Sequence, residues 1–140
     1  MGLFGLFSKS KPSLSSLEFK IAGLFAYENE AKELMGKNPV LEKVKKKEGA
    51  RVFVLGVFDG PCELVPEPKN KHDKNAIMVI SGGHQLGYVP MDMQEEVKAR
   101  MKAGFETSIS LSGGNRRVYE DGDWVIYKGD IRGVVRMDPR

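Results

Sequence analysis

The chain has 140 residues, enough for one domain, and its 41% hydrophobic and 29% charged residues are ordinary for a globular protein. It carries 22 Lys and Arg against 19 Asp and Glu, and the net charge of +3 does not by itself indicate nucleic acid. A single cysteine, Cys62, excludes an intrachain disulfide, and one Cys with two His cannot close a zinc site, so neither a metal nor another cofactor is expected.

The first 16 residues are expected to form a flexible tail, because residues 8–16 are rich in Ser, Lys and Pro. Met1–Phe7 has no basic region before it and is not a secretion signal; a weak membrane or partner anchor is the alternative. The single cysteine is typical of an intracellular protein, and no apolar run reaches the ~20 residues of a transmembrane helix, so a cytoplasmic protein without a membrane partner is expected. The domain itself is expected to span residues 17–137.

The first half of this domain is predicted to contain strands and one helix. Leu17–Phe25 alternates apolar and polar residues and is the first predicted strand. Glu28–Met35 consists mainly of helix-forming residues and is predicted to be a helix. Arg51–Phe58 is rich in β-branched and aromatic residues, and Cys62–Val65 is predicted to continue extended after a turn at Asp59-Gly60.

The second half begins with a predicted hairpin. Ala76–Ile80 and Gln85–Val89 read as its strands, joined by a tight turn at residues 81–83. A helix is predicted over Asp92–Ala103, with the Asp92 side chain as its N-cap.

The C-terminal part is predicted to be β-rich. Phe105–Ser112 alternates as a strand, Gly113-Gly114-Asn115 is expected to turn the chain back, and residues 116–137 are β-rich but interrupted by glycines. About six strands and two or three helices indicate a mainly β fold (β-rich α+β), a barrel or sandwich with helices covering an opening.

Two neighbouring motifs carry a family resemblance. Residues 67–77 read Glu-Pro-Lys-Asn-Lys-His-Asp-Lys-Asn-Ala-Ile, and residues 82–90 read Gly-Gly-His-Gln-Leu-Gly-Tyr-Val-Pro. Their order and spacing resemble the signature of the HIRAN domain family, in its bacterial-type, stand-alone form. Upstream, residues 19–27 resemble the family's first strand, with Phe25 and Ala26 where an Arg and an aromatic residue are usual.

The resemblance implies a small OB-like β-barrel that binds single-stranded DNA with a free 3′ end, in DNA repair or replication-related processes. Because family members are often fused to DNA translocases or helicases, it also implies a DNA-processing enzyme supplied in trans. A protein-interaction or adaptor domain that keeps the HIRAN scaffold without binding DNA is the alternative function. No enzyme is predicted, since no nucleophile, base or phosphate-binding loop stands out in the sequence.

The residues of the signature suggest how a strand end would be held. A carboxylate such as Asp73 can accept a hydrogen bond from a sugar hydroxyl but repels phosphate, which lysines of the same loop would attract. Aromatic rings and His72 offer flat faces for bases. The alternative for Asp73 is that it braces the loop through local hydrogen bonds. The predicted nucleic-acid-binding residues are Phe25, Tyr27, Asn70, Lys71, His72, Asp73, Lys74 and Tyr88.

Two basic runs lie outside this signature. Val40–Lys47 is Lys-rich, with Val40, Leu41 and Val44 at near-helical spacing, and Arg116-Arg117 follows the glycines at 113 and 114. Each is interpreted as a solvated surface, with a steering patch for nucleic acid as the alternative.

Overall fold

The computed structural model describes residues 13–140, so the predicted tail is outside the described part apart from residues 13–16, as is the anchor alternative for Met1–Phe7. The predicted mainly β, OB-like domain with covering helices is confirmed: within the described residues there are ten strands and two α-helices. None of the helices between residues 13 and 140 has the length and apolar character needed to cross a membrane.

The strands are β1 (Leu17–Lys20), β2 (Arg51–Phe53), β3 (Phe58–Pro61), β4 (Glu63–Pro66), β5 (Ile77–Ser81), β6 (His84–Tyr88), β7 (Glu106–Gly113), β8 (Arg116–Glu120), β9 (Asp123–Tyr127) and β10 (Ile131–Asp138). The helices are α2 (Glu28–Met35) and α3 (Gln94–Lys102), with 3₁₀ turns η1 (Leu24–Tyr27), η2 (Leu41–Lys43) and η3 (Met91–Met93).

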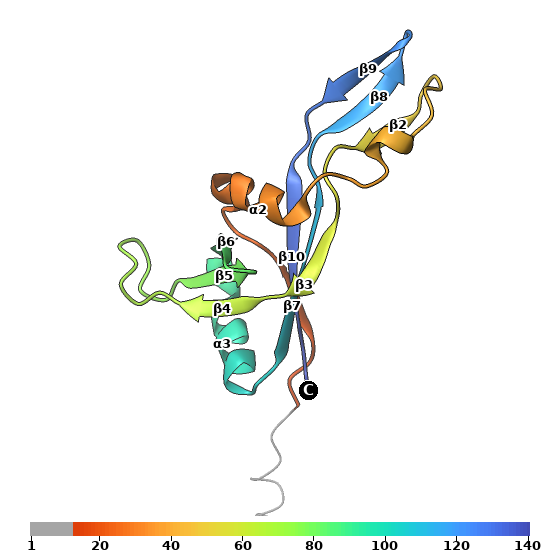
Figure 1. Cartoon of the computed structure of the whole chain (residues 1–140). Coiled ribbons are helices and arrows are strands. Elements are labelled where there is room, and N and C mark those ends of the chain that lie inside the picture. The colour runs from red at the N-terminus through yellow and green to blue at the C-terminus, as the bar shows by residue number, and fades with distance from the viewer. Residues whose placement is uncertain (1–12) are drawn as a thin grey trace, which may run out of the picture.

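Three antiparallel sheets organise the molecule. Two of them, ordered β1-β10-β7-β3 and β4-β5-β6, form with the α-helices what we call the body. The third, β2-β8-β9, projects away from it, and we call this sheet with residues 41–50 the arm (Figure 1). The β3–β4 segment passes from the first sheet to the second at Cys62, whose N–H donates to the Thr107 carbonyl at 3.1 Å.

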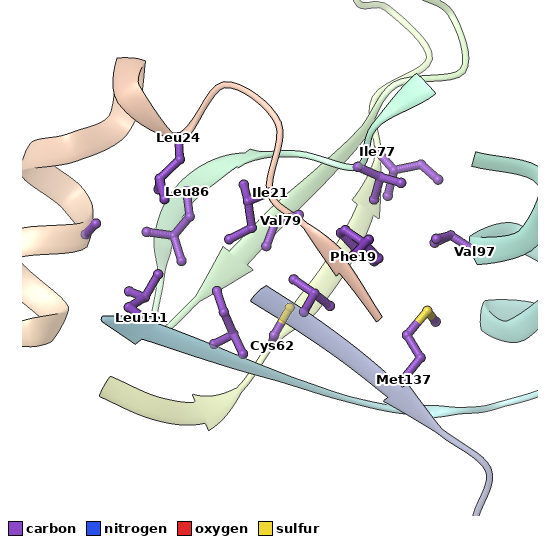
Figure 2. Close-up of a cluster of buried hydrophobic side chains, with 14 of the residues drawn as sticks. Phe19, Ile21, Leu24, Cys62, Ile77, Val79, Leu86, Val97, Leu111 and Met137 are labelled. Carbon is purple, nitrogen blue, oxygen red and sulfur yellow. The ribbon is translucent and has the colours of Figure 1, made fainter. Parts of the chain in front are cut away.

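The core lies in the body, between its two sheets and its helices (Figure 2). Strands contribute side chains with at most 3% exposure, among them Leu86, Leu111 and Met137. Helix α2 adds Ala31 and α3 adds Val97, both fully buried. Burial at roughly 25 cal/mol per Å² of apolar surface makes this cluster the main source of stability.

The turn predicted at residues 113–115 is wrong. Ile131 pairs with Gly113 and Tyr127 pairs with Arg116, so β7–β10 and β8–β9 are two parts of one long hairpin. The chain reverses instead between Glu120 and Asp123, through Asp121-Gly122. The glycines permit close passage of the two chains, since a Cβ on Gly129 would lie 2.4 Å from the Gly114 carbonyl oxygen. They therefore mark a crossing within a hairpin and not its end.

Three other sequence predictions also need correction. The first strand ends at Lys20, because Gly23 adopts a left-handed conformation and starts the 3₁₀ turn η1. The predicted strand Arg51–Phe58 is interrupted after Phe53, and Asp59-Gly60 lies inside β3 as part of a strand. Asp92 does not cap a helix, since no side-chain cap bond is formed and η3 precedes α3.

Two local predictions are confirmed. Helix α2 spans Glu28–Met35 as predicted, and its end at Gly36 is closed by a backbone bond to Lys32. The β5–β6 hairpin pairs Ser81 with His84 across a two-residue turn. This hairpin packs beside α2, where His84 Nδ1 lies 3.5 Å from the Glu30 carboxylate.

Candidate nucleic-acid interface

A pocket of about 390 Å³ opens where residues 67–76, which we call the signature loop, meet η1, the end of β6 and η3. The predicted residues that line it are Tyr27, Asn70, His72, Asp73 and Tyr88. Its other lining residues are Ala22, Ala76, Val89, Met91 and Gln94. The pocket therefore brings together side chains from segments that are far apart in the sequence.

Asn70 organises the signature loop through its side chain. Its Oδ1 accepts the backbone N–H of His72 at 2.9 Å and that of Asp73 at 3.0 Å. Its Nδ2 donates to the Glu67 carboxylate, so both ends of the amide are used within the loop. Such side-chain to backbone bonds are what favours Asn in turns, and here they hold His72 exposed at the pocket rim.

Asp73 has a partner for each carboxylate oxygen. Oδ1 accepts the Asn75 N–H at 2.9 Å, and Oδ2 accepts the side-chain amide of Gln94 at 2.7 Å. The Gln94 bond first, then the Asn75 N–H and the charge of Lys98, hold the pKa of Asp73 below its ordinary value. Asp73 is therefore an ionised carboxylate in the pocket lining that also ties the loop to α3.

Tyr88 and Tyr27 form the aromatic part of the lining. Their ring centroids lie 6.4 Å apart at 63°, an edge-to-face contact. The Tyr88 hydroxyl donates to Glu67 at 3.0 Å, and burial raises the pKa of Tyr88, which keeps that proton in place. The Tyr27 hydroxyl accepts a bond from Gln85 at 3.1 Å.

Gly87 sets the approach of two chain segments beneath this pocket. Ala22 and Tyr88 exchange backbone hydrogen bonds of 2.8 and 2.9 Å, which join the end of the first strand segment to β6. A Cβ on Gly87 would lie 2.4 Å from the Ala22 carbonyl oxygen, and the residue has φ of +137°. The Gly-Tyr step thus needs glycine for close approach and places Tyr88 in the lining.

Three predicted site residues are outside the lining. Phe25 lies on η1 with 85% of its surface exposed, so it belongs neither to the core nor to the pocket lining. Lys71 and Lys74 are exposed on the signature loop.

Gln94 is the main lining residue that the sequence reasoning did not identify. It is buried, and it lies about one helical turn before Val97 on the buried face of α3. A polar residue on the apolar stripe of an amphipathic helix is the signal that could have identified it, since a buried amide requires a partner.

A mainly β domain with a braced loop beside an aromatic pocket is a small binding module. The chain belongs to the HIRAN domain family, whose model matches residues 48–122, more than half of its 140 residues, and both predicted motifs are inside that span. HIRAN domains bind nucleic acid and are not catalytic by themselves. No curated protein matches the chain. The crystal structure of the HIRAN domain of human HLTF is similar at 15% identity and a TM-score of 0.40, covering 91% of this chain and 78% of that one.

Proposed function

We propose that the pocket holds the free 3′ end of a single DNA strand, in repair or replication-related processes served by a DNA-processing enzyme in trans. The observation that carries the proposal is the convergence of Tyr27, Asn70, His72, Asp73 and Tyr88 on one pocket. The tyrosine rings and the imidazole offer a terminal base surfaces for stacking, which does not depend on base identity.

A carboxylate in the lining suits a hydroxyl and disfavours a phosphate. Each Asp73 oxygen accepts one bond within the protein, which leaves a second lone-pair site on each for a ligand hydroxyl. Because the pKa of Asp73 is lowered, its charge is present at neutral pH and would repel a terminal phosphate. Lys71 and Lys74 are exposed on the same loop and would attract the phosphates that follow the terminal nucleotide.

The test compares one short oligothymidine with a 3′-hydroxyl, a 3′-phosphate or only its 5′ end accessible, by fluorescence anisotropy. We expect the 3′-hydroxyl form to bind severalfold more tightly than the other two. Binding should weaken with salt by about 0.7 log units in affinity per log unit of salt for each phosphate contacted. Equal affinities for the three oligonucleotides would rule out end recognition.

Asp73→Asn is the informative variant, because it removes the charge and keeps the shape. The new amide oxygen can still accept the Asn75 N–H, and Gln94 can rotate its amide to accept from the new amide nitrogen, so the loop stays braced. We expect the variant to lose its discrimination against the 3′-phosphate. Asp92→Asn removes the same charge from an exposed residue outside the lining and should leave that discrimination unchanged.

An adaptor domain is the second candidate function. It is favoured by the internal use of the Asn70 amide and by Phe25, an exposed aromatic side chain that is not in the pocket lining. If the parent protein binds none of the oligonucleotides at low salt, the hydrogen bonds of the signature loop only stabilise the fold. That result would favour the adaptor function.

A further inference from the structure

The arm carries aromatic and cationic side chains on one face of its sheet. Residues that stand directly opposite one another on antiparallel strands share a face. Arg116 of β8 pairs with Phe53 of β2 on one side and with Tyr127 of β9 on the other. The next row on the same face, two residues along β8, pairs Val118 with Arg51 and Val125. We call these two rows the open face of the arm.

The row of Phe53, Arg116 and Tyr127 on this face is exposed and Val118 in the second row is buried, whereas η2 covers part of the opposite face. Phe53 is 46% exposed and Tyr127 is 39% exposed, and the Arg116 side chain beside them is exposed as well. On the opposite face, Arg117 donates to the Leu41 carbonyl at 2.6 Å and brings η2 over the sheet. The neighbours Arg116 and Arg117 thus lie on different faces, one open and one packed around Arg117 but exposed at Ile126.

In the part of the chain that the structure describes, the cations of the open face have no ion-pair partner. Within residues 13–140, Arg51 and Arg116 form no ion pair, whereas Arg117 on the packed face lies 3.7 Å from Glu42. Lys45, Lys46 and Lys47 are exposed in the segment that leads into β2. Among the described residues, the arm therefore presents positive charge outside ion pairs, on its open face and in the segment before β2.

Aromatic rings stand among these cations. A hollow of about 220 Å³ is lined by Arg51, Val52, Phe53 and Arg116. The Arg116 guanidinium lies 5.9 Å from the Tyr127 ring centroid, and the Tyr127 hydroxyl donates to Glu120 at 2.7 Å, which fixes the ring along the sheet. Exposed rings interleaved with guanidinium groups match a polyanion that also has flat apolar bases.

We propose that the open face of the arm is a second contact surface for single-stranded nucleic acid, with bases stacked on Phe53 and Tyr127 and phosphates paired with Arg51 and Arg116. Unstacked bases on the aromatic residues of an open sheet are a recurring arrangement in single-strand recognition. Arg51 and Arg116 complement the phosphates, while the next row of this face, Glu120 opposite Asp123, is acidic and limits the contact to the two rows named above. The contact requires no strand end. It therefore does not depend on the end pocket, the pocket at the signature loop. In Figure 1 that loop, between β4 and β5, and the arm lie in different parts of the molecule.

The test uses a covalently closed circle of about 30 thymidines, longer than the roughly 4–16 nucleotides that one OB-type surface covers. The circle has no 3′ end, so the end pocket alone cannot account for its binding. We expect the parent protein to bind it at low salt. Replacing both Phe53 and Tyr127 by Leu should weaken binding by at least about tenfold, since each stacked ring contributes to affinity. Tyr127→Phe keeps the ring and should bind like the parent.

The arginines have a separate readout. Arg51→Gln with Arg116→Gln should reduce the slope of log affinity against log salt by about 1.4, or about 0.7 for each phosphate that is no longer paired with a cation. Lys20→Gln with Lys102→Gln removes the same charge from exposed positions on the body and should leave the slope unchanged. Ile126→Ala, an exposed apolar residue on the opposite face of β9, is the matched control for the aromatic variants.

Several outcomes would overturn this inference. One is that the circle does not bind the parent; another is that it binds all the face variants equally. A third is a parent protein that dimerises in sedimentation and becomes monomeric when Phe53 is changed to Leu, because the face would then bind a second copy. Loss of 3′-end discrimination in Asp73→Asn while the circle still binds leaves the open face intact, which separates this test from that of the end pocket.

Discussion

The two halves of the long C-terminal hairpin share one backbone ladder but differ in what packs on them. In the body half, Ile109, Leu111, Val135 and Met137 are at most 3% exposed. In the arm half, Val125, Ile126 and Tyr127 are 39–57% exposed. Paired backbones are therefore not enough to specify a role: the packed half holds the fold together, and the unpacked half leaves a face available for a ligand.

The largest expected difference between the halves is in stability. Leu111→Ala removes a fully buried side chain from the core and should lower the free energy of unfolding by about 2–5 kcal/mol. Val125→Ala on the arm should change it by no more than about 0.5 kcal/mol. Urea unfolding followed by reactivity of Cys62, the only thiol, and by fluorescence of Trp124, the only tryptophan, reports the body and the arm separately. Similar losses for both variants would show that the arm is as tightly packed as the body.

The stability of the body should depend on alkaline pH because the Cys62 thiol is buried in its core. Burial, and then the charge of Glu63, raise the pKa of Cys62 from 9.0 to about 12. Above pH 9 the unfolded chain loses the thiol proton while the folded protein keeps it, so the unfolded state binds fewer protons and stability falls as pH rises. This loss continues until the pH passes about 12, at no more than about 1.4 kcal/mol per pH unit.

The measurement is urea unfolding at pH 8 and pH 10 for the parent and for Cys62→Ala. The variant lacks the titrating thiol, so it should lose less stability between the two pH values than the parent does. The same dependence in both proteins would assign the alkaline loss to other groups. Between pH 8 and pH 10, the fluorescence of Trp124, which lies in the arm, should show no transition of its own.

Local turn chemistry explains which parts of the fold were predictable. The β5–β6 hairpin and helix α2 follow from residues adjacent in sequence, so their patterns were sufficient. The long hairpin was not predicted, because Gly113-Gly114-Asn115 has the composition of a turn and its role depends on Asp130 across the sheet. Sequence patterns cannot distinguish a glycine that turns a chain from one that lets a second chain pass.

The candidate site divides along the same line. Asn70 and Asp73 bond within the signature loop, and the preference of such side chains for local bonds predicted this bracing. The hydrogen bond from Gln94 to Asp73 joins residues about 20 positions apart, and the bond from Gln85 to Tyr27 joins residues about 60 positions apart. Those contacts need the folded core. The functional role of each lining residue stays a prediction until the binding experiments are made.

The smallest expected effect tests what holds η2 against the sheet within the arm. Arg117 donates to the Leu41 carbonyl, and its guanidinium lies 4.6 Å from the centroid of the Trp124 ring. Among residues 13–140 its buried Nε has no hydrogen-bond partner, and its ion-pair partner Glu42 is 65% exposed. Arg117→Met loses one charge-assisted bond and also removes an unpaired polar atom, so the two terms offset each other and an exposed ion pair adds little. We expect a loss below about 1 kcal/mol, together with a changed Trp124 emission because the cation leaves the ring. Arg132→Met, an exposed arginine on β10, is the control and should leave that emission unchanged. A loss of stability as large as that of Leu111→Ala would mean that the Arg117 contacts stabilise the whole fold. The contrast between a tightly packed body and a weakly packed arm would then be wrong.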